Sequence, residues 1–127
     1  MMTTKGDASP GVRTPAEARQ SIRRALAPGT SVASPQVDDL LLVATELVTN
    51  AQRHGGGVTG FTLDVRKGSV AVSVSDASRC PPRRRTLTQD LRPGGYGWPI
   101  VLRLSREVTV DVRADGKTVR AVVPLDG

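Results

Sequence analysis

The sequence feature that most constrains the fold is the stretch 37–54, which three glycines follow at 55–57. Its apolar residues recur every three or four positions, as in a helix with one face in a core. They are Val37, Leu40, Leu41, Ala44, Leu47, Val48 and Ala51. Ser34 is a candidate N-cap, and Pro35 occupies the first helical position, where its missing N–H costs nothing. The sequence therefore predicts an amphipathic helix that ends at the glycines.

The polar side of this helix carries a candidate functional pair. At about 100° per residue, Glu46 points roughly opposite the apolar stripe, and Asn50 lies one turn further along. A carboxylate and a carboxamide at this i, i+4 spacing can hold a divalent metal ion and orient a water molecule. A solvated pair without a function has the same spacing, so helix geometry alone leaves both interpretations open.

Composition limits the classes of protein to which the chain can belong. Its 127 residues suffice for one domain with a real core. Aromatic residues make up only 2% of the chain, so the core must consist of valine, leucine and alanine. No apolar run approaches the length of about 18 residues that a membrane span needs, and the N-terminus has no hydrophobic signal region. With one cysteine, Cys80, the composition predicts a cytoplasmic protein that does not enter a membrane.

The chain is basic, with 18 lysine and arginine residues, 12 acidic residues and a formal net charge of +6. Such a surface could meet nucleic acid, an acidic protein or a polyphosphate. Binding to DNA has little support, because no aromatic residues alternate with the arginines and no zinc-ligand spacing or helix-turn-helix pattern is evident. Direct contact with nucleic acid is not expected, and a basic DNA-binding domain is the least supported hypothesis for the function.

The N-terminal part is predicted to hold a tail and a further helix. Residues 1–13 are polar and contain glycine and proline, which is typical of a flexible tail. Thr14 and Glu17 form a capping-box pattern with proline at the first helical position, and a helix is expected to follow to about residue 27. One domain is therefore expected over residues 14–127.

After the three glycines the apolar period changes from 3.6 to 2, which is typical of β-strands. Residues 61–74 form one predicted hairpin and residues 108–123 a second, each with glycine in its turn. Strands with one apolar face and amphipathic helices together predict a two-layer α+β sandwich. The helices would cover one face of a mixed, mostly antiparallel sheet.

The least regular stretch, residues 77–93, separates the two hairpins. A loop of this length inside a compact domain is usually functional or disordered. It leads to Gly94, Gly95 and Gly97, directly before a short predicted helix with proline in its first turn. Free N–H groups and the positive end of the helix dipole would meet there and suit a phosphate. Such glycines often form only a tight turn, so this pattern alone does not distinguish a phosphate site from an ordinary turn.

Asp76, at the end of the first hairpin, adds a third feature. A carboxylate at a strand end can accept a hydrogen bond from an exocyclic amine such as that of adenine. Together with the Glu46–Asn50 pair and the glycine turn, it indicates a nucleotide site.

The segment Glu46–His54, ELVTNAQRH, resembles the N box of the GHKL ATPases, the superfamily of gyrase, heat-shock chaperone, histidine kinase and mismatch-repair ATPases. Within it the segment is similar to the branch of anti-sigma-factor serine/threonine kinases, in which ELVTNAxRH is characteristic. Residues 74–76 resemble the first glycine box, residues 94–97 the second, and residues 116–119 the final box. The resemblance covers about residues 14–124.

This resemblance implies the Bergerat ATP-binding fold, which agrees with the predicted two-layer architecture. Asn50 would be a ligand of the Mg²⁺ that bridges the ATP phosphates. Glu46 would be the catalytic residue that orients or activates the attacking hydroxyl or water.

The resemblance also implies how the nucleotide would be held. Asp76 would bind the adenine amine, with Thr118 supporting it through an ordered water. Gly95 and Gly97 would let the backbone approach the phosphates. Residues 77–93 would form a lid over ATP.

By this resemblance the chain would phosphorylate a serine or threonine of a STAS-type anti-anti-sigma partner and alternatively sequester a sigma factor. Members of the branch are often dimers, so a homodimer is one expected assembly. The first glycine box departs from the family pattern D-x-G-x-G, because Ser78 and Cys80 stand where the family has glycine. This departure motivates the alternative of a catalytically weak or inactive module that acts only by sequestration.

Overall fold

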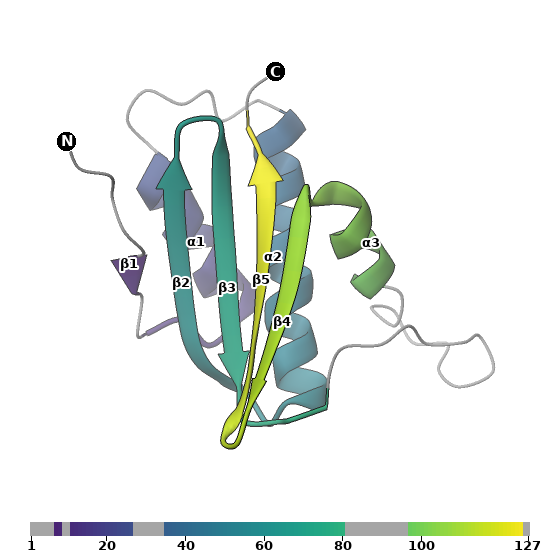
Figure 1. Ribbon diagram of the computed structural model, residues 1–127. Helices are drawn as coiled ribbons and strands as arrows, with labels where there is room; N and C mark the ends of the chain where they lie inside the picture. The colour runs from purple at the N-terminus through teal and green to yellow at the C-terminus, as the bar shows by residue number, and fades with distance from the viewer. Residues whose placement is uncertain (1–6, 9–10, 27–34, 81–96, 126–127) are drawn as a thin grey trace.

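The computed structural model describes residues 7–8, 11–26, 35–80 and 97–125, and its described elements form a layer of helices behind an antiparallel sheet (Figure 1). The helices are α1 (Pro15–Leu26), α2 (Pro35–His54) and α3 (Gly97–Leu104). The strands are β1 (Asp7–Ala8), β2 (Val58–Arg66), β3 (Ser69–Asp76), β4 (Glu107–Arg113) and β5 (Gly116–Pro124). Their order in the sheet is β1-β2-β3-β5-β4. The predicted two-layer sandwich is confirmed, and each ladder between described strands is antiparallel.

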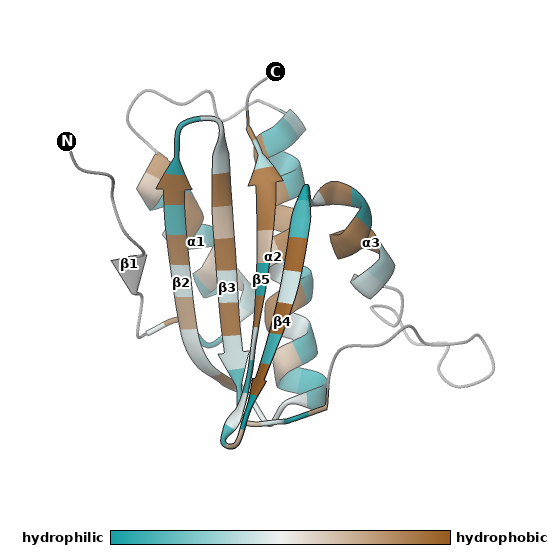
Figure 2. Cartoon of the chain, in the orientation of Figure 1, coloured by the Kyte–Doolittle hydropathy of each residue, from teal (hydrophilic) through white to brown (hydrophobic). Residues whose placement is uncertain are grey.

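The core lies between the sheet and the helices. Alternate residues of the long strands face the helices, and Figure 2 shows the resulting alternation of hydrophobic and hydrophilic bands. The buried strand residues include Phe61, Leu63, Val70, Val72, Val74, Val119, Ala121 and Val123. The face of α2 that meets them carries Leu40, Val43, Ala44, Leu47 and Val48, each exposed by 2% or less. Burial of each larger side chain contributes about 1.5–3 kcal/mol, so this seam fixes how α2 is rotated.

The predicted capping box starts α1. The backbone N–H of Glu17 donates to Thr14 Oγ1 at 3.2 Å, and the N–H of Thr14 donates to Glu17 Oε1 at 3.1 Å. A further hydrogen bond from the backbone N–H of Arg13 lowers the pKa of Glu17. Among the described helices, none is both long and apolar enough to cross a membrane.

The second predicted helix is confirmed as α2, which begins at Pro35 and ends at His54. Its predicted N-cap, Ser34, lies outside the described residues. The backbone N–H groups of Gly55 and Gly57 both donate to the carbonyl of Ala51, at 3.0 and 2.9 Å, and so close the C-terminal end.

The described part of residues 1–13 differs from the predicted flexible tail. Asp7 and Ala8 form β1 and pair with Leu63 and Thr62 of β2. Val12 is 5% exposed and belongs to the core. The outer edge of β2 offers unpaired backbone groups to which an extended segment can bond, and one valine in a polar stretch is too weak a signal to predict this.

Candidate nucleotide site

The first part of the candidate site lies where α2 meets α3. Glu46 of α2 faces the start of α3, because a Cβ added to Gly97 would overlap its carboxyl group. Asn50 is half-buried one turn further along α2, and i, i+4 neighbours share a helix flank. The structure therefore brings Gly97 against Glu46, which the sequence separates by 51 positions, and Asn50 lies one helical turn from Glu46.

The environment of Glu46 is unusual for a carboxylate on a helix surface. Its Oε1 atom is buried and has no hydrogen-bond partner among the described residues. Burial raises the pKa of Glu46 above its ordinary value, and the positive charge of Arg53 offsets this only in part. A buried acceptor without a donor is costly, so the interpretation of Glu46 as a simple solvated residue does not fit. This oxygen is suited to accept a proton or hydrogen bond from a bound hydroxyl or water.

Gly97 is needed at the start of α3 because its backbone lies against the Glu46 carboxyl. We expect Gly97→Ala to push α3 and Glu46 apart and to lower stability by about 1–3 kcal/mol, the usual effect of overpacking. Thermal unfolding would measure this, with Gly60→Ala as the control, since a Cβ there meets Ser75 Cβ at 3.5 Å and Ser75 Oγ at 3.6 Å, both ordinary contacts. Equal melting temperatures for the two variants would contradict the close contact.

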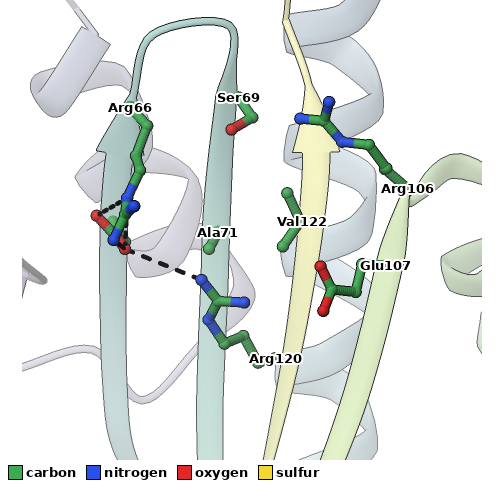
Figure 3. A pocket seen from close by; sticks show the side chains of 8 residues that line it. Arg66, Ser69, Ala71, Arg106, Glu107, Arg120 and Val122 are labelled. Atoms are coloured by element: carbon green, nitrogen blue, oxygen red, sulfur yellow. Dashed lines mark hydrogen bonds and ion pairs between the residues drawn. The ribbon is translucent and has the colours of Figure 1, made fainter.

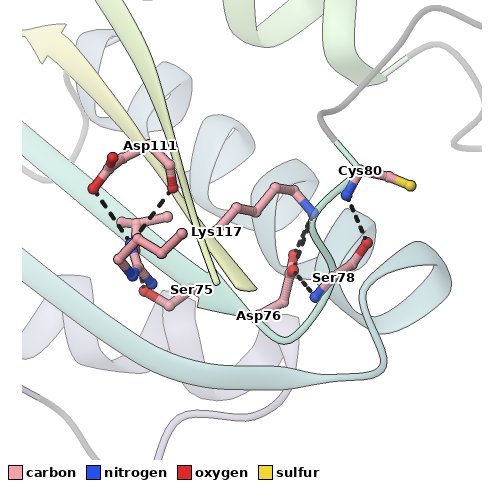
Figure 4. A network of polar contacts seen from close by, with 8 residues as sticks. Ser75, Asp76, Ser78, Cys80, Asp111 and Lys117 are labelled. Atoms are coloured by element: carbon pink, nitrogen blue, oxygen red, sulfur yellow. Dashed lines mark hydrogen bonds and ion pairs between the residues drawn. The ribbon is translucent and has the colours of Figure 1, made fainter. Parts of the chain in front are cut away.

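The second part of the site is Asp76, the last residue of β3, which is 5% exposed. Its carboxylate is already bonded, as Figure 4 shows. Lys117 Nζ donates to Oδ1 at 3.0 Å and to Oδ2 at 2.9 Å, and the backbone N–H of Ser78 donates to Oδ1 at 2.8 Å. Lys117 is itself 5% exposed, so the two charges form a buried ion pair.

Two glycines enclose Asp76 from other directions. Gly55, directly after α2, lies against the carboxylate so closely that a Cβ would overlap it, and its carbonyl accepts the N–H of Ala77 at 3.2 Å. Gly116 lies against the Asp76 carbonyl and has a φ of 148°, which few other residues adopt. The glycines after α2 therefore also make room for Asp76, a role that the sequence pattern did not reveal.

The two parts lie at different heights along α2, one in its second half and the other at its C-terminal end. Glu46 lies nine residues before Gly55, which touches Asp76. At about 1.5 Å per residue, this corresponds to about 13 Å along the helix. A span of that size suits an extended ligand with a base at one end and phosphates at the other.

The structure does not bring Thr118 to Asp76, contrary to the prediction from the final box. Side chains alternate along β5, and Thr118 pairs with Ser75 on the outer face of the sheet, where their hydroxyls lie 2.7 Å apart. Arg113 also donates to the Thr118 hydroxyl at 2.9 Å. The residue on the inner face is Lys117, opposite Asp76. The apolar alternation of Val119, Ala121 and Val123, carried two residues back, could have identified it.

The altered first glycine box has a local structure of its own. Ser78 donates its backbone N–H to Asp76, and its hydroxyl accepts the N–H of Cys80 at 3.1 Å. Side-chain bonds of this kind stabilise successive turns. Gly95 and most of the predicted lid, residues 81–93, lie outside the described residues.

A hollow on the outer face of the sheet is separate from these residues (Figure 3). It is lined by Asp64, Arg66, Ser69, Ala71, Arg106, Glu107, Arg120 and Val122. Asp64 forms ion pairs with Arg66 at 2.9 Å and with Arg120 at 3.9 Å. Its carboxylate thus already compensates two of the arginines, and we assign no ligand to this hollow.

The resemblance implies Mg-ATP as the ligand. The residues on the inner side of the sheet would fit its phosphates better than its base. Glu46 offers an oxygen without a hydrogen-bond partner in the described part of the chain, and with the Asn50 carboxamide and the backbone at Gly97 it would suit a metal-bound phosphate and its attacking group. At the base end, Asp76 has the acceptor that an adenine amine needs, but Lys117 occupies it. Among the described residues, the Glu46 oxygen is therefore left without a donor, whereas the Asp76 carboxylate is occupied by Lys117.

Fold and site together define an ATPase domain of the histidine kinase type. A family model described as a histidine kinase-like ATPase domain matches residues 9–123. The chain therefore belongs to this family, in agreement with the GHKL resemblance of its sequence. Membership supports ATP binding, which in this superfamily usually involves Mg²⁺.

Two solved structures from Erythrobacter litoralis EL346 are similar in fold. The histidine kinase domain of its blue-light activated histidine kinase shares 19% identity with a TM-score of 0.53, over 98% of this chain and 66% of that one. The blue-light activated histidine kinase shares 21% identity with a TM-score of 0.51, over 87% of this chain and 40% of that one. The chain thus spans about two thirds or less of these relatives, and the likeness establishes the fold alone. No curated protein of similar sequence was found.

Proposed function

We propose that the chain is a cytoplasmic, Mg-ATP-binding regulator of the anti-sigma-factor type. It phosphorylates a serine or threonine of a STAS-type anti-anti-sigma partner and alternatively sequesters a sigma factor. The observation that carries the proposal is the buried oxygen of Glu46, which has no hydrogen-bond partner among the described residues and lies beside Gly97, one turn from Asn50. The N-box sequence ELVTNAQRH supports the serine/threonine branch.

In this proposal the partner hydroxyl oxygen attacks the γ-phosphorus of ATP. A new oxygen–phosphorus bond forms, the bond from the γ-phosphorus to the β–γ bridging oxygen breaks, and ADP leaves. Glu46 takes the hydroxyl proton, and its raised pKa makes the ionised form a stronger base than an exposed glutamate. Asn50 would hold the metal ion, which would supply positive charge against the phosphates.

The direct test is transfer of labelled γ-phosphate from ATP to a purified STAS-type protein from the same genome. We expect label on the partner and none on a partner whose acceptor serine or threonine is replaced by alanine. A chain that binds Mg-ATP yet leaves every such partner unlabelled would contradict the kinase proposal. Retention of a sigma factor by the immobilised chain tests the sequestering function in the same preparation.

A second candidate function is a binding module that sequesters its partner with little or no phosphoryl transfer. The ion pair between Lys117 and Asp76 favours it, because this pair fills the carboxylate that would bind the base. Under this alternative, capture of the sigma factor would be the same with and without Mg-ATP. Under the kinase proposal, Mg-ATP and phosphorylation of the anti-anti-sigma partner would change how much sigma factor the chain captures.

A further inference from the structure

We propose that Lys117 is an internal competitor for Asp76, so that a nucleotide gains a hydrogen bond to this carboxylate only by displacing the lysine. The inference rests on the proposed binding of ATP and identifies a residue that sets the affinity for its base. It follows from how completely the Asp76 carboxylate is occupied.

Neither oxygen of Asp76 has room for a further donor. A carboxylate oxygen offers two lone pairs, and Oδ1 already accepts Lys117 Nζ at 3.0 Å and the N–H of Ser78 at 2.8 Å. Oδ2 accepts Lys117 Nζ at 2.9 Å, and the backbone of Gly55 lies directly against it. With 5% of Asp76 exposed, an exocyclic amine cannot reach the carboxylate while Lys117 stays in place.

The lysine holds this position by charge as well as by geometry. An ammonium adds the attraction of opposite charges to its hydrogen bonds with a carboxylate, whereas a base amine is neutral and offers its hydrogen bond without a full positive charge. Separating a buried ion pair is also costly, because each charge loses its partner in a place with little water. The amine of a nucleotide therefore cannot displace Lys117 by itself, and binding at the phosphate end must supply the difference.

This arrangement predicts an unusual binding preference. In the wild type, ATP and a purine ribonucleoside triphosphate without the 6-amino group should bind about equally, since neither reaches Asp76 at low cost. Removing the ammonium opens the carboxylate, and only the nucleotide with the amine can use it.

The test is binding of these two nucleotides, with Mg²⁺, to Lys117→Met by calorimetry. Methionine keeps much of the length of the side chain and has no donor. We expect about tenfold or more tighter binding of ATP, the worth of one hydrogen bond to a charged group, and unchanged binding of the analogue without the amine. Lys67→Met is the matched control, because it removes the same charge from an exposed turn and should bind both nucleotides like the wild type.

The outcomes separate this inference from the proposed function. Equal or weaker ATP binding by a folded Lys117→Met protein, beside a wild type that binds ATP, would overturn the competition and leave the nucleotide site intact. Folded wild-type and variant proteins that both fail to bind ATP would overturn the proposed nucleotide site as well. If Lys117→Met does not fold, Lys117→Gln keeps a neutral donor group, its side-chain NH₂, for Asp76. It should show a smaller gain that again depends on the amine, and absence of that gain would overturn the inference.

Discussion

Asn50→Ala is expected to weaken binding of Mg-ATP by at least about 100-fold, to below detection at millimolar nucleotide. Loss of a group that only supports a metal ligand already costs about 10–100-fold in metal affinity, and Asn50 is the proposed ligand itself. The side chain is half-buried one turn from Glu46, on the flank of α2 that meets α3. Calorimetric titration with ATP in Mg²⁺, and again in a chelator, measures the effect.

The neighbouring Thr49→Ala is the control for Asn50→Ala. Thr49 is also half-buried on α2, but one residue is about 100° around the helix, so its side chain does not share the direction of Asn50. Binding of ATP by Thr49→Ala should match the wild type. If a folded Asn50→Ala protein bound Mg-ATP with wild-type affinity, Asn50 would not be the metal ligand, and its assignment would be wrong.

The helices and strands were predictable because their signals are local and repeated. The apolar spacing in α2, the capping box of Thr14 and Glu17, and the alternation in β2 and β3 each depend on residues close in sequence. The strand β1 was not predictable, since a two-residue strand is held by the edge of β2 and by no pattern of its own.

In the candidate site, the sequence predicted which residues stand at the proposed phosphate end, but not which residue pairs with Asp76 at the proposed base end. Glu46, Asn50 and Asp76 follow from motif spacing, but burial of a Glu46 oxygen against Gly97 depends on how α3 packs on α2. Thr118 and Lys117 differ by one position in a strand, and a shift of one residue reverses which side chain faces the core. Strand alternation was the more reliable guide there than the motif.

The burial of Glu46 should also make the free energy of unfolding depend on pH. Since its pKa is raised in the folded state, the folded chain binds more protons than the unfolded one between the ordinary value of 4.5 and the raised value. Stability contributed by this group is therefore highest below the ordinary pKa and falls as pH rises through that window. A function that needs an ionised, partly buried carboxylate thus lowers the stability of the free protein near neutral pH.

Glu46→Gln is accordingly expected to lower phosphoryl transfer by about 10²–10⁴-fold, the usual contribution of a general base, while ATP binding stays near the wild-type value. The amide has nearly the same shape and contacts Gly97 in the same way, but it cannot take a proton. Transfer of labelled phosphate to the STAS-type partner measures the rate, and calorimetry measures binding. The wild-type rate should rise with pH through the raised pKa of Glu46, and the variant should lack this rise. Loss of ATP binding in Glu46→Gln together with loss of transfer would instead assign Glu46 to holding the nucleotide, and an unchanged rate would exclude it as the base.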